Sequence, residues 1–138
     1  MIRKVFVDTS YVLALFNTSD EFHIKAKAIK KFTLYPNKII TTEAILLEIG
    51  NALSKRNLRQ RCSAFIKGFY ETKNIEVVPL TTELIKEGLE LFEERKDKEW
   101  GLVDCISFVV MKKHGIKDAL AADDHFIQAE FNALLLEK

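Results

Sequence analysis

Four acidic residues lie beside or inside apolar segments, where a carboxylate is costly to bury. Asp8 and Asp123 each directly follow a short apolar run, Asp104 lies within a long one, and Glu48 borders the apolar face of a predicted helix. A buried carboxylate costs several kcal/mol unless its charge is compensated. One divalent cation can compensate several carboxylates at once, and oxygen ligands suit Mg²⁺ or Mn²⁺. The pattern therefore indicates a metal-dependent enzyme that acts on phosphate esters.

Strand and helix patterns alternate along the chain. Amphipathic segments with helical spacing separate the apolar or β-branched runs, and this alternation is typical of an α/β fold with a parallel sheet. We predict four strands and a fifth at the edge of the sheet, at residues 2–7, 38–40, 75–78, 118–122 and 134–136.

The composition predicts one folded domain, residues 1–138. A hydrophobic fraction of 48% and ten phenylalanines supply a full core, which excludes global disorder. The net charge of +1 excludes no class of partner. Cys62 and Cys105 lack C-x-x-C spacing, which is typical of reduced thiols in a cytoplasmic protein. No run approaches the roughly 18 apolar residues of a membrane span, so we expect no membrane association.

The predicted topology brings the acidic residues together. In parallel sheets, ligands bind beyond the carboxyl ends of the strands, where Asp8 and Asp123 stand. Asp104 belongs to the first turn of the helix before the fourth strand, where negative charge is favoured. Glu43 and Glu48 compete for the fourth position. On a helical wheel only Glu48 lies close to the apolar face, so we choose Glu48.

Each of these acids also has an ordinary structural interpretation. Asp8 can cap the helix that follows it, and Asp104 can help a helix begin. Glu48 can form an ion pair with Lys55 or Arg56, and Asp123 can be a turn residue. One shared site explains all four positions together, whereas the ordinary interpretations need four separate explanations.

Four segments, in order, resemble the acidic motifs of the PIN-domain family, and more closely its small toxin-like ribonucleases of the virulence-associated protein C type. The first is Val7-Asp8-Thr9-Ser10 with the apolar residues after it, and the second runs from Thr41 to Leu53 with its acid at Glu48. The third is Trp100 to Phe108 with its acid at Asp104, and the fourth is Ala119 to Phe126 with its acid at Asp123.

The resemblance implies a three-layer α/β/α sandwich and Mg²⁺- or Mn²⁺-dependent cleavage of single-stranded RNA, leaving a 5′-phosphate and a 3′-hydroxyl. Asp8, Asp104, Asp123 and Glu48 would hold the cation, with the hydroxyls of Thr9 and Ser10 beside them. The resemblance also implies a homodimer and, for many members, an antitoxin protein that holds the toxin inactive.

One position departs from the family pattern. Val103 stands where the family usually has Ser or Thr before its third acid, so a hydroxyl that can orient an acid or a water is absent. This keeps open a second interpretation, a PIN-like module that binds RNA or protein without turnover. A third is a different strand-end aspartate enzyme, such as a phosphohydrolase or a phosphoacceptor domain. Asp8-Thr9-Ser10 lacks the second Asp of a D-x-D nucleophile motif, which argues against the phosphohydrolase.

Basic residues follow the predicted Glu48 helix and are candidates for binding phosphates, although a solvated helix face explains each of them singly. They are Lys55, Arg56, Arg59, Arg61 and Lys67, with a second group at Lys96, Lys98, Lys112 and Lys113. Trp100 can stack on a base. For His125, a packing or turn role is favoured over acid–base chemistry.

Overall fold

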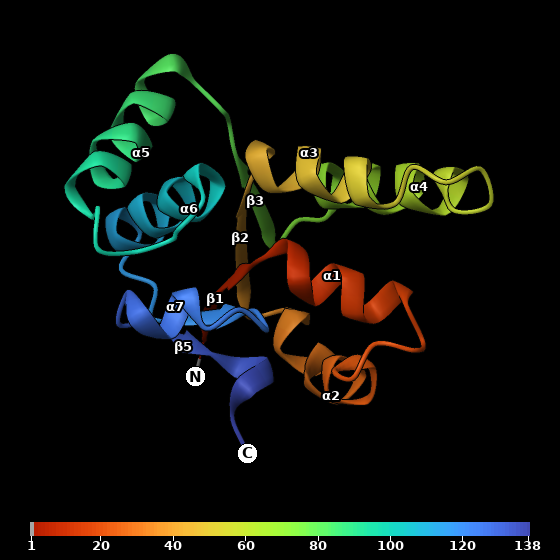
Figure 1. Ribbon diagram of the computed structural model, residues 1–138. Coiled ribbons are helices and arrows are strands. Elements are labelled where there is room, and N and C mark those ends of the chain that lie inside the picture. Colours follow the sequence, from red (N-terminus) through yellow and green to blue (C-terminus); the bar gives the residue numbers. More distant parts are fainter. Residues whose placement is uncertain (1) are drawn as a thin grey trace.

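A parallel sheet forms the centre of the computed structural model, which describes residues 2–138 (Figure 1). Within these residues five strands pair in the order β3-β2-β1-β4-β5, and every ladder is parallel. The strands are β1 (Lys4–Val7), β2 (Lys38–Thr42), β3 (Ile75–Val78), β4 (Asp118–Leu120) and β5 (Asn132–Ala133). The predicted α/β fold with a central parallel sheet is confirmed.

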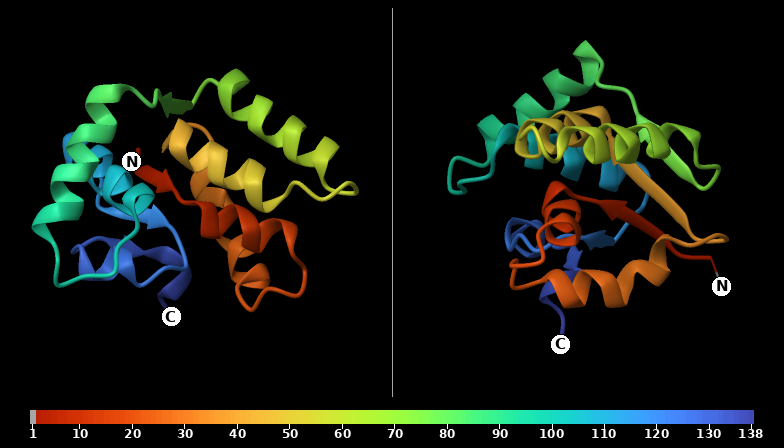
Figure 2. Two further views of the ribbon diagram at one scale, coloured as in Figure 1. Left: turned by 45° about the horizontal axis from the view of Figure 1, so that its top comes forward. Right: turned by 90° about the vertical axis from the view of Figure 1, so that its right-hand side faces the viewer.

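Helices connect the strands and cover both faces of the sheet. The helices are α1 (Thr9–Phe16), α2 (His23–Ala28), α3 (Glu43–Ala52), α4 (Arg59–Glu71), α5 (Thr82–Glu94), α6 (Leu102–Lys113) and α7 (His125–Gln128). Short 3₁₀ helices follow α2 at Ile29–Thr33 and β5 at Leu134–Leu136. Helices α1 to α4 gather on one side and α5 to α7 on the other, as the views in Figures 1 and 2 show.

The strand order reverses between β1 and β4. From β1 the chain moves outward through β2 to β3, and then it crosses back to place β4 on the other side of β1. Val7 at the end of β1 pairs with Leu120 at the end of β4, and the Asp8 amide donates to the Leu120 carbonyl at 3.1 Å. This reversal is the place where open α/β sheets bind ligands. The fold therefore directs both strand-end aspartates to one cleft.

The core explains why the central strands read as unbroken apolar runs. Val5 and Phe6 of β1 are fully buried, as is Leu120 of β4, because helices cover both faces of the sheet. The ring of Phe126 packs edge-on against Phe108, with centroids 5.0 Å apart, and also lies against Phe6. This packing seats α7 against α6 and the sheet.

Side chains cap three of the helices near the sheet edge. Asp8 accepts from the Ser10 amide at the start of α1, Thr42 accepts from Ile45 at the start of α3, and Thr81 accepts from Leu84 at the start of α5. Each cap satisfies a backbone N–H that the first helical turn leaves without a partner.

Four of the five predicted strands differ from the structure in their bounds. The first strand begins at Lys4 instead of residue 2, and the second continues to Thr42 instead of ending at residue 40. The predicted edge strand 134–136 is a 3₁₀ helix, and β5 is the preceding pair Asn132–Ala133. The fourth strand ends at Leu120 instead of residue 122, because Ala121 and Ala122 bond outside the ladder. The Ala121 carbonyl accepts from the Leu135 amide, and the Ala122 amide donates to Ser10. Apolar character marked these segments correctly as buried but did not distinguish strand from turn.

A short turn separates α3 from α4. Helix α3 ends at Ala52, and α4 begins at Arg59. The backbone turns at Lys55, whose carbonyl accepts from both Leu58 and Arg59. In the part of the chain from residue 2 onward, no helix is long and apolar enough to cross a membrane.

Candidate metal centre

Asp8 lies at the junction of β1 and α1 and is almost completely buried, with 6% of its surface exposed. Its Oδ2 accepts two hydrogen bonds from Ser10, from the amide at 3.1 Å and from the hydroxyl at 2.5 Å. Burial raises the pKa of Asp8 to about 6, the Ser10 hydrogen bonds oppose this rise, and the charges of Asp104 and Glu48 add to it. Ionisation of Asp8 is therefore disfavoured mainly by burial, and the nearby negative charges add to this effect.

Ser10 connects Asp8 to the end of β4. Its hydroxyl donates to Asp8 and accepts from the Ala122 amide at 2.9 Å. Ala122 immediately precedes Asp123, so one hydroxyl orients the first acid and also holds the backbone that carries the fourth.

Glu48 reaches the same region from the middle of α3. Its Oε1 accepts from the Thr9 hydroxyl at 2.6 Å. Glu43, the alternative acid, has a different role. Its carboxylate accepts from the Leu80 amide at 2.9 Å and from the Tyr70 hydroxyl at 2.7 Å, and these bonds lower the pKa of Glu43. Glu43 therefore joins α4 to the segment before α5, and Glu48 is the acid on α3 beside Thr9 and Asp8.

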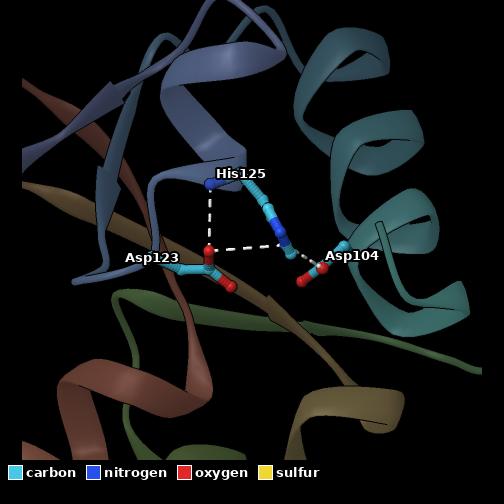
Figure 3. A group of neighbouring side chains, drawn as sticks. All are labelled: Asp104, Asp123 and His125. Atoms are coloured by element: carbon cyan, nitrogen blue, oxygen red, sulfur yellow. Dashed lines mark hydrogen bonds and ion pairs between the residues drawn. The ribbon is translucent and has the colours of Figure 1, made fainter. Parts of the chain in front are cut away.

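Asp104 and Asp123 meet at the imidazole of His125 (Figure 3). The ring Nδ1 lies 2.9 Å from Asp104 Oδ2 and 3.4 Å from Asp123 Oδ1. The backbone amides complete the arrangement, since Gly101 donates to Asp104 Oδ2 at 3.1 Å and His125 donates to Asp123 Oδ1 at 2.9 Å. One ligand atom from each of Asp104, Asp123 and His125 lies within 4.8 Å of the others, a spacing that can hold a metal ion.

His125 is the residue of this site that sequence reasoning missed. The sequence favours a packing or turn role, whereas in the structure the ring contacts two of the predicted acids. Burial lowers the pKa of His125, but the hydrogen bond to Asp104 and the charges of Asp123, Asp104 and Asp124 outweigh burial, so the pKa rises. Its position two residues after Asp123 was the signal in the sequence that could have found it.

The four carboxylates share one pattern of hydrogen bonding. Each has one oxygen held by protein donors: Oδ2 of Asp8, Oε1 of Glu48, Oδ2 of Asp104 and Oδ1 of Asp123. From residues 2–138, no hydrogen bond reaches the other oxygen of any of them. Four partly anchored carboxylates with one free oxygen each fit a hard divalent cation such as Mg²⁺ or Mn²⁺.

Four of the predicted basic residues lie on the turn between α3 and α4 and on the first turn of α4, and Lys67 lies further along α4. The side chains of Lys55, Arg56, Arg59 and Arg61 are exposed. Arg59 donates to the Ser54 carbonyl at 3.0 Å, and the guanidinium of Arg61 lies 5.0 Å from the ring centroid of Phe16 on α1. Beside them, a hollow of about 560 Å³ opens between α3 and α4, lined in part by Arg59 and Lys67.

Comparison with known proteins agrees with this geometry. The family model described as the PIN domain matches residues 5–132. The chain belongs to the PIN-domain family. This PIN domain is 31% identical over 127 residues to the 23S rRNA-specific endonuclease VapC20 of Mycobacterium tuberculosis, covering 92% of this chain and 95% of the relative. It is also 26% identical over 138 residues to the ribonuclease VapC1 of Aquifex aeolicus, covering 99% and 92%.

A solved structure shows the same fold. The crystal structure of Mycobacterium tuberculosis VapC20, described as a sarcin–ricin loop cleaving toxin, superimposes with a TM-score of 0.80 at 30% identity, covering 94% of this PIN domain and 97% of that chain. The predicted resemblance to virulence-associated protein C-type proteins is confirmed, and the names of the relatives bear out the predicted ribonuclease class.

Proposed function

We propose that this PIN domain is a divalent-metal-dependent endoribonuclease and the toxin of a toxin–antitoxin pair. The observation that carries the proposal is the meeting of Asp104 and Asp123 at His125, close enough to buried Asp8 and to Glu48 for the charges of Asp104 and Glu48 to act on Asp8. Each of the four carboxylates has one anchored and one free oxygen. The relatives named as a ribosomal RNA endonuclease and a ribonuclease support RNA as the substrate.

The free carboxylate oxygens would hold Mg²⁺ or Mn²⁺, and a bound ion of this kind would supply Lewis acidity and a lowered pKa for a coordinated water. The protein's own side chains orient the site. Thr9 holds Glu48, Ser10 holds Asp8, and the Gly101 amide with His125 holds Asp104. Because these donors are already in place, the carboxylates need little reorganisation to receive the cation or a scissile phosphate.

The exposed basic turn supplies a phosphate-binding surface. Helix α1 begins at the acidic site, and the middle of α3 contributes Glu48 to it; the two helices lie side by side (Figure 2). At their far ends lies a second hollow, lined by Phe16 of α1 and by Lys55 and Leu58 of the turn. RNA whose scissile phosphate lies at the carboxylates would place further phosphates along this route, near Lys55, Arg56, Arg59 and Arg61.

Single-stranded RNA is the proposed substrate form. VapC20 is named for 23S rRNA and its sarcin–ricin loop, so a ribosomal loop is the first sequence to test. An antitoxin protein and a homodimer complete the proposal. An exposed apolar stripe on α5, formed by Ile85, Leu89 and Phe92, supports association with a second copy, because the spacing of four and three residues places these side chains on one helix face.

The test is cleavage of two RNAs, a mixed-sequence single strand and a sarcin–ricin loop oligonucleotide, in Mg²⁺, Mn²⁺ or chelator. Wild type is expected to cut in metal and not in chelator, leaving 5′-phosphate ends. Asp104→Asn should abolish cutting. Asp97→Asn, at a surface aspartate paired with Arg95, should not. If folded wild type binds RNA but cleaves neither of the two RNAs in Mg²⁺ or Mn²⁺, the result would favour the binding-module interpretation that Val103 keeps open.

A further inference from the structure

We propose that His125 is a positioning residue that orients Asp104 and Asp123 for the cation. The inference rests on the proposed metal centre and adds a residue that lies outside the four acidic positions. His125 opens α7, Asp104 lies on α6, and Asp123 follows β4, so the three residues come from three separate elements. Without a link between them, the relative placement of the two carboxylates would depend on helix packing alone.

His125 provides that link through two different groups. Its backbone amide donates to Asp123 Oδ1 at 2.9 Å, and its ring Nδ1 lies 2.9 Å from Asp104 Oδ2. A carboxylate oxygen only accepts, so the ring nitrogen carries the hydrogen in the Asp104 contact. The Gly101 amide donates to the same Asp104 oxygen at 3.1 Å.

These bonds determine which carboxylate oxygens remain for a cation. Asp104 Oδ2 has two donors and Asp123 Oδ1 has one, whereas their partner oxygens accept no hydrogen bond from the described residues. Because Nδ1 carries hydrogen in the Asp104 contact, this nitrogen has no lone pair for a metal, and its role toward Asp104 is to orient the carboxylate. The Phe126 ring, fully buried against Phe108, keeps α7 and therefore His125 in place.

Removal of the ring separates this role from simple packing. His125→Ala deletes the bond to Asp104 but leaves the backbone bond to Asp123. His125→Asn restores an N–H close to the position of Nδ1 and should recover the function. His114→Ala is the matched control, because His114 caps the opposite end of α6. Removing a residue that orients a metal ligand typically changes metal affinity by about 10- to 100-fold.

The experiment is calorimetric titration of Mn²⁺ into the full chain, with cleavage rates measured alongside. Relative to wild type, we expect His125→Ala to bind Mn²⁺ about 10- to 100-fold more weakly and to lose kcat more than KM. His125→Asn should return to within about threefold of wild-type affinity, and His114→Ala should equal wild type. Equal affinity for His125→Ala and wild type, or an Asn variant as weak as Ala, would overturn the positioning role. No Mn²⁺ binding by wild type would instead overturn the proposed metal centre itself.

Discussion

The Thr9 hydroxyl donates to Glu48 Oε1 across 2.6 Å, joining residues that are 39 positions apart in the sequence. The bond connects the first turn of α1 to the middle of α3 and holds the acid that comes from the second motif. The next residue, Ser10, uses its hydroxyl for Asp8 and for the backbone beside Asp123. Two consecutive hydroxyls thus orient acids from separate elements, at a site where the hydroxyl expected before Asp104 is replaced by Val103.

Removal of the Thr9 hydroxyl should weaken the site while leaving the fold intact. Thr9→Val keeps the side-chain volume and deletes the donor, so Glu48 loses its anchor. We expect metal affinity or kcat to fall by about tenfold, whereas Thr9→Ser, which retains the hydroxyl, should stay close to wild type. Titration with Mn²⁺ and single-turnover cleavage measure both effects. Equal behaviour of the Val variant and wild type would show that the bond has no functional role.

Loss of the Ser10 hydroxyl should lower stability as well as activity. Ser10→Ala leaves the Ala122 amide without its hydrogen-bond acceptor and removes a donor from buried Asp8. We expect a loss of about 1–3 kcal/mol in the free energy of unfolding, measured by urea denaturation in chelator. Ser63→Ala, at an exposed serine of α4, is the control and should change stability by less than about 0.5 kcal/mol.

Neutralisation of Asp8 should stabilise the metal-free protein above pH 6. Its folded pKa of about 6 exceeds the ordinary value of 3.8, so the folded state binds this proton more tightly than the unfolded state. That stabilisation is complete below about pH 3.8 and is lost as the pH rises through 6. Asp8→Asn should therefore exceed wild type in free energy of unfolding by roughly 2–3 kcal/mol at pH 8, since one pKa unit corresponds to about 1.4 kcal/mol.

Two comparisons make the Asp8 measurement decisive. At pH 4 the two proteins should differ little, and Asp124→Asn, at an exposed neighbouring aspartate, should follow wild type at both pH values. With saturating Mn²⁺ the order should reverse, because only wild type retains the full set of carboxylates. A wild type more stable than Asp8→Asn at pH 8 in chelator would contradict the assigned burial cost.

The placement of the four acids could be predicted because local patterns determine it. Asp8 directly follows β1 and Asp123 follows β4 by three residues, so both lie beyond the carboxyl ends of the strands, and the helical wheel separates Glu48 from Glu43. In the structure the Glu43 carboxylate accepts hydrogen bonds from Tyr70 and from the Leu80 amide, so it has a different role from the four acids of the site. The use of the four acids as metal ligands stays a prediction, because the geometry supports it without testing it.

His125 could not be predicted because its role depends on how α7 packs. The residue has no distinctive neighbours in the sequence beyond Asp123, and only the seating of Phe126 against Phe108 brings its ring to Asp104, 21 positions away. The error at 134–136 has a similar origin. Three leucines fit a buried strand or a buried 3₁₀ turn equally well, and the bond from Leu135 to Ala121 decides between them.

RNA binding should depend on salt and on the basic turn after α3. Changing Arg56, Arg59 and Arg61 together to Gln should weaken binding to single-stranded RNA and reduce the slope of log K against log salt by about 0.7 for each phosphate that the variant no longer neutralises. The same number of changes at Lys27, Lys30 and Lys31, exposed lysines of α2 and the 3₁₀ helix after it, is the control and should leave the slope unchanged. Fluorescence anisotropy at several salt concentrations, with catalytically inactive Asp104→Asn as background, measures both. An unchanged slope in the arginine variant would show that the basic turn does not bind RNA phosphates.

The most direct test of the shared metal centre is titration of Mn²⁺ into wild type and into four single variants. The variants are Asp8→Asn, Glu48→Gln, Asp104→Asn and Asp123→Asn. Glu43→Gln, at the other acid on α3, is the control. The account predicts saturable binding by wild type and Glu43→Gln, and weaker binding by at least about tenfold in each of the other four. No binding by folded wild type at millimolar Mn²⁺, or wild-type affinity in all four carboxylate variants, would contradict it.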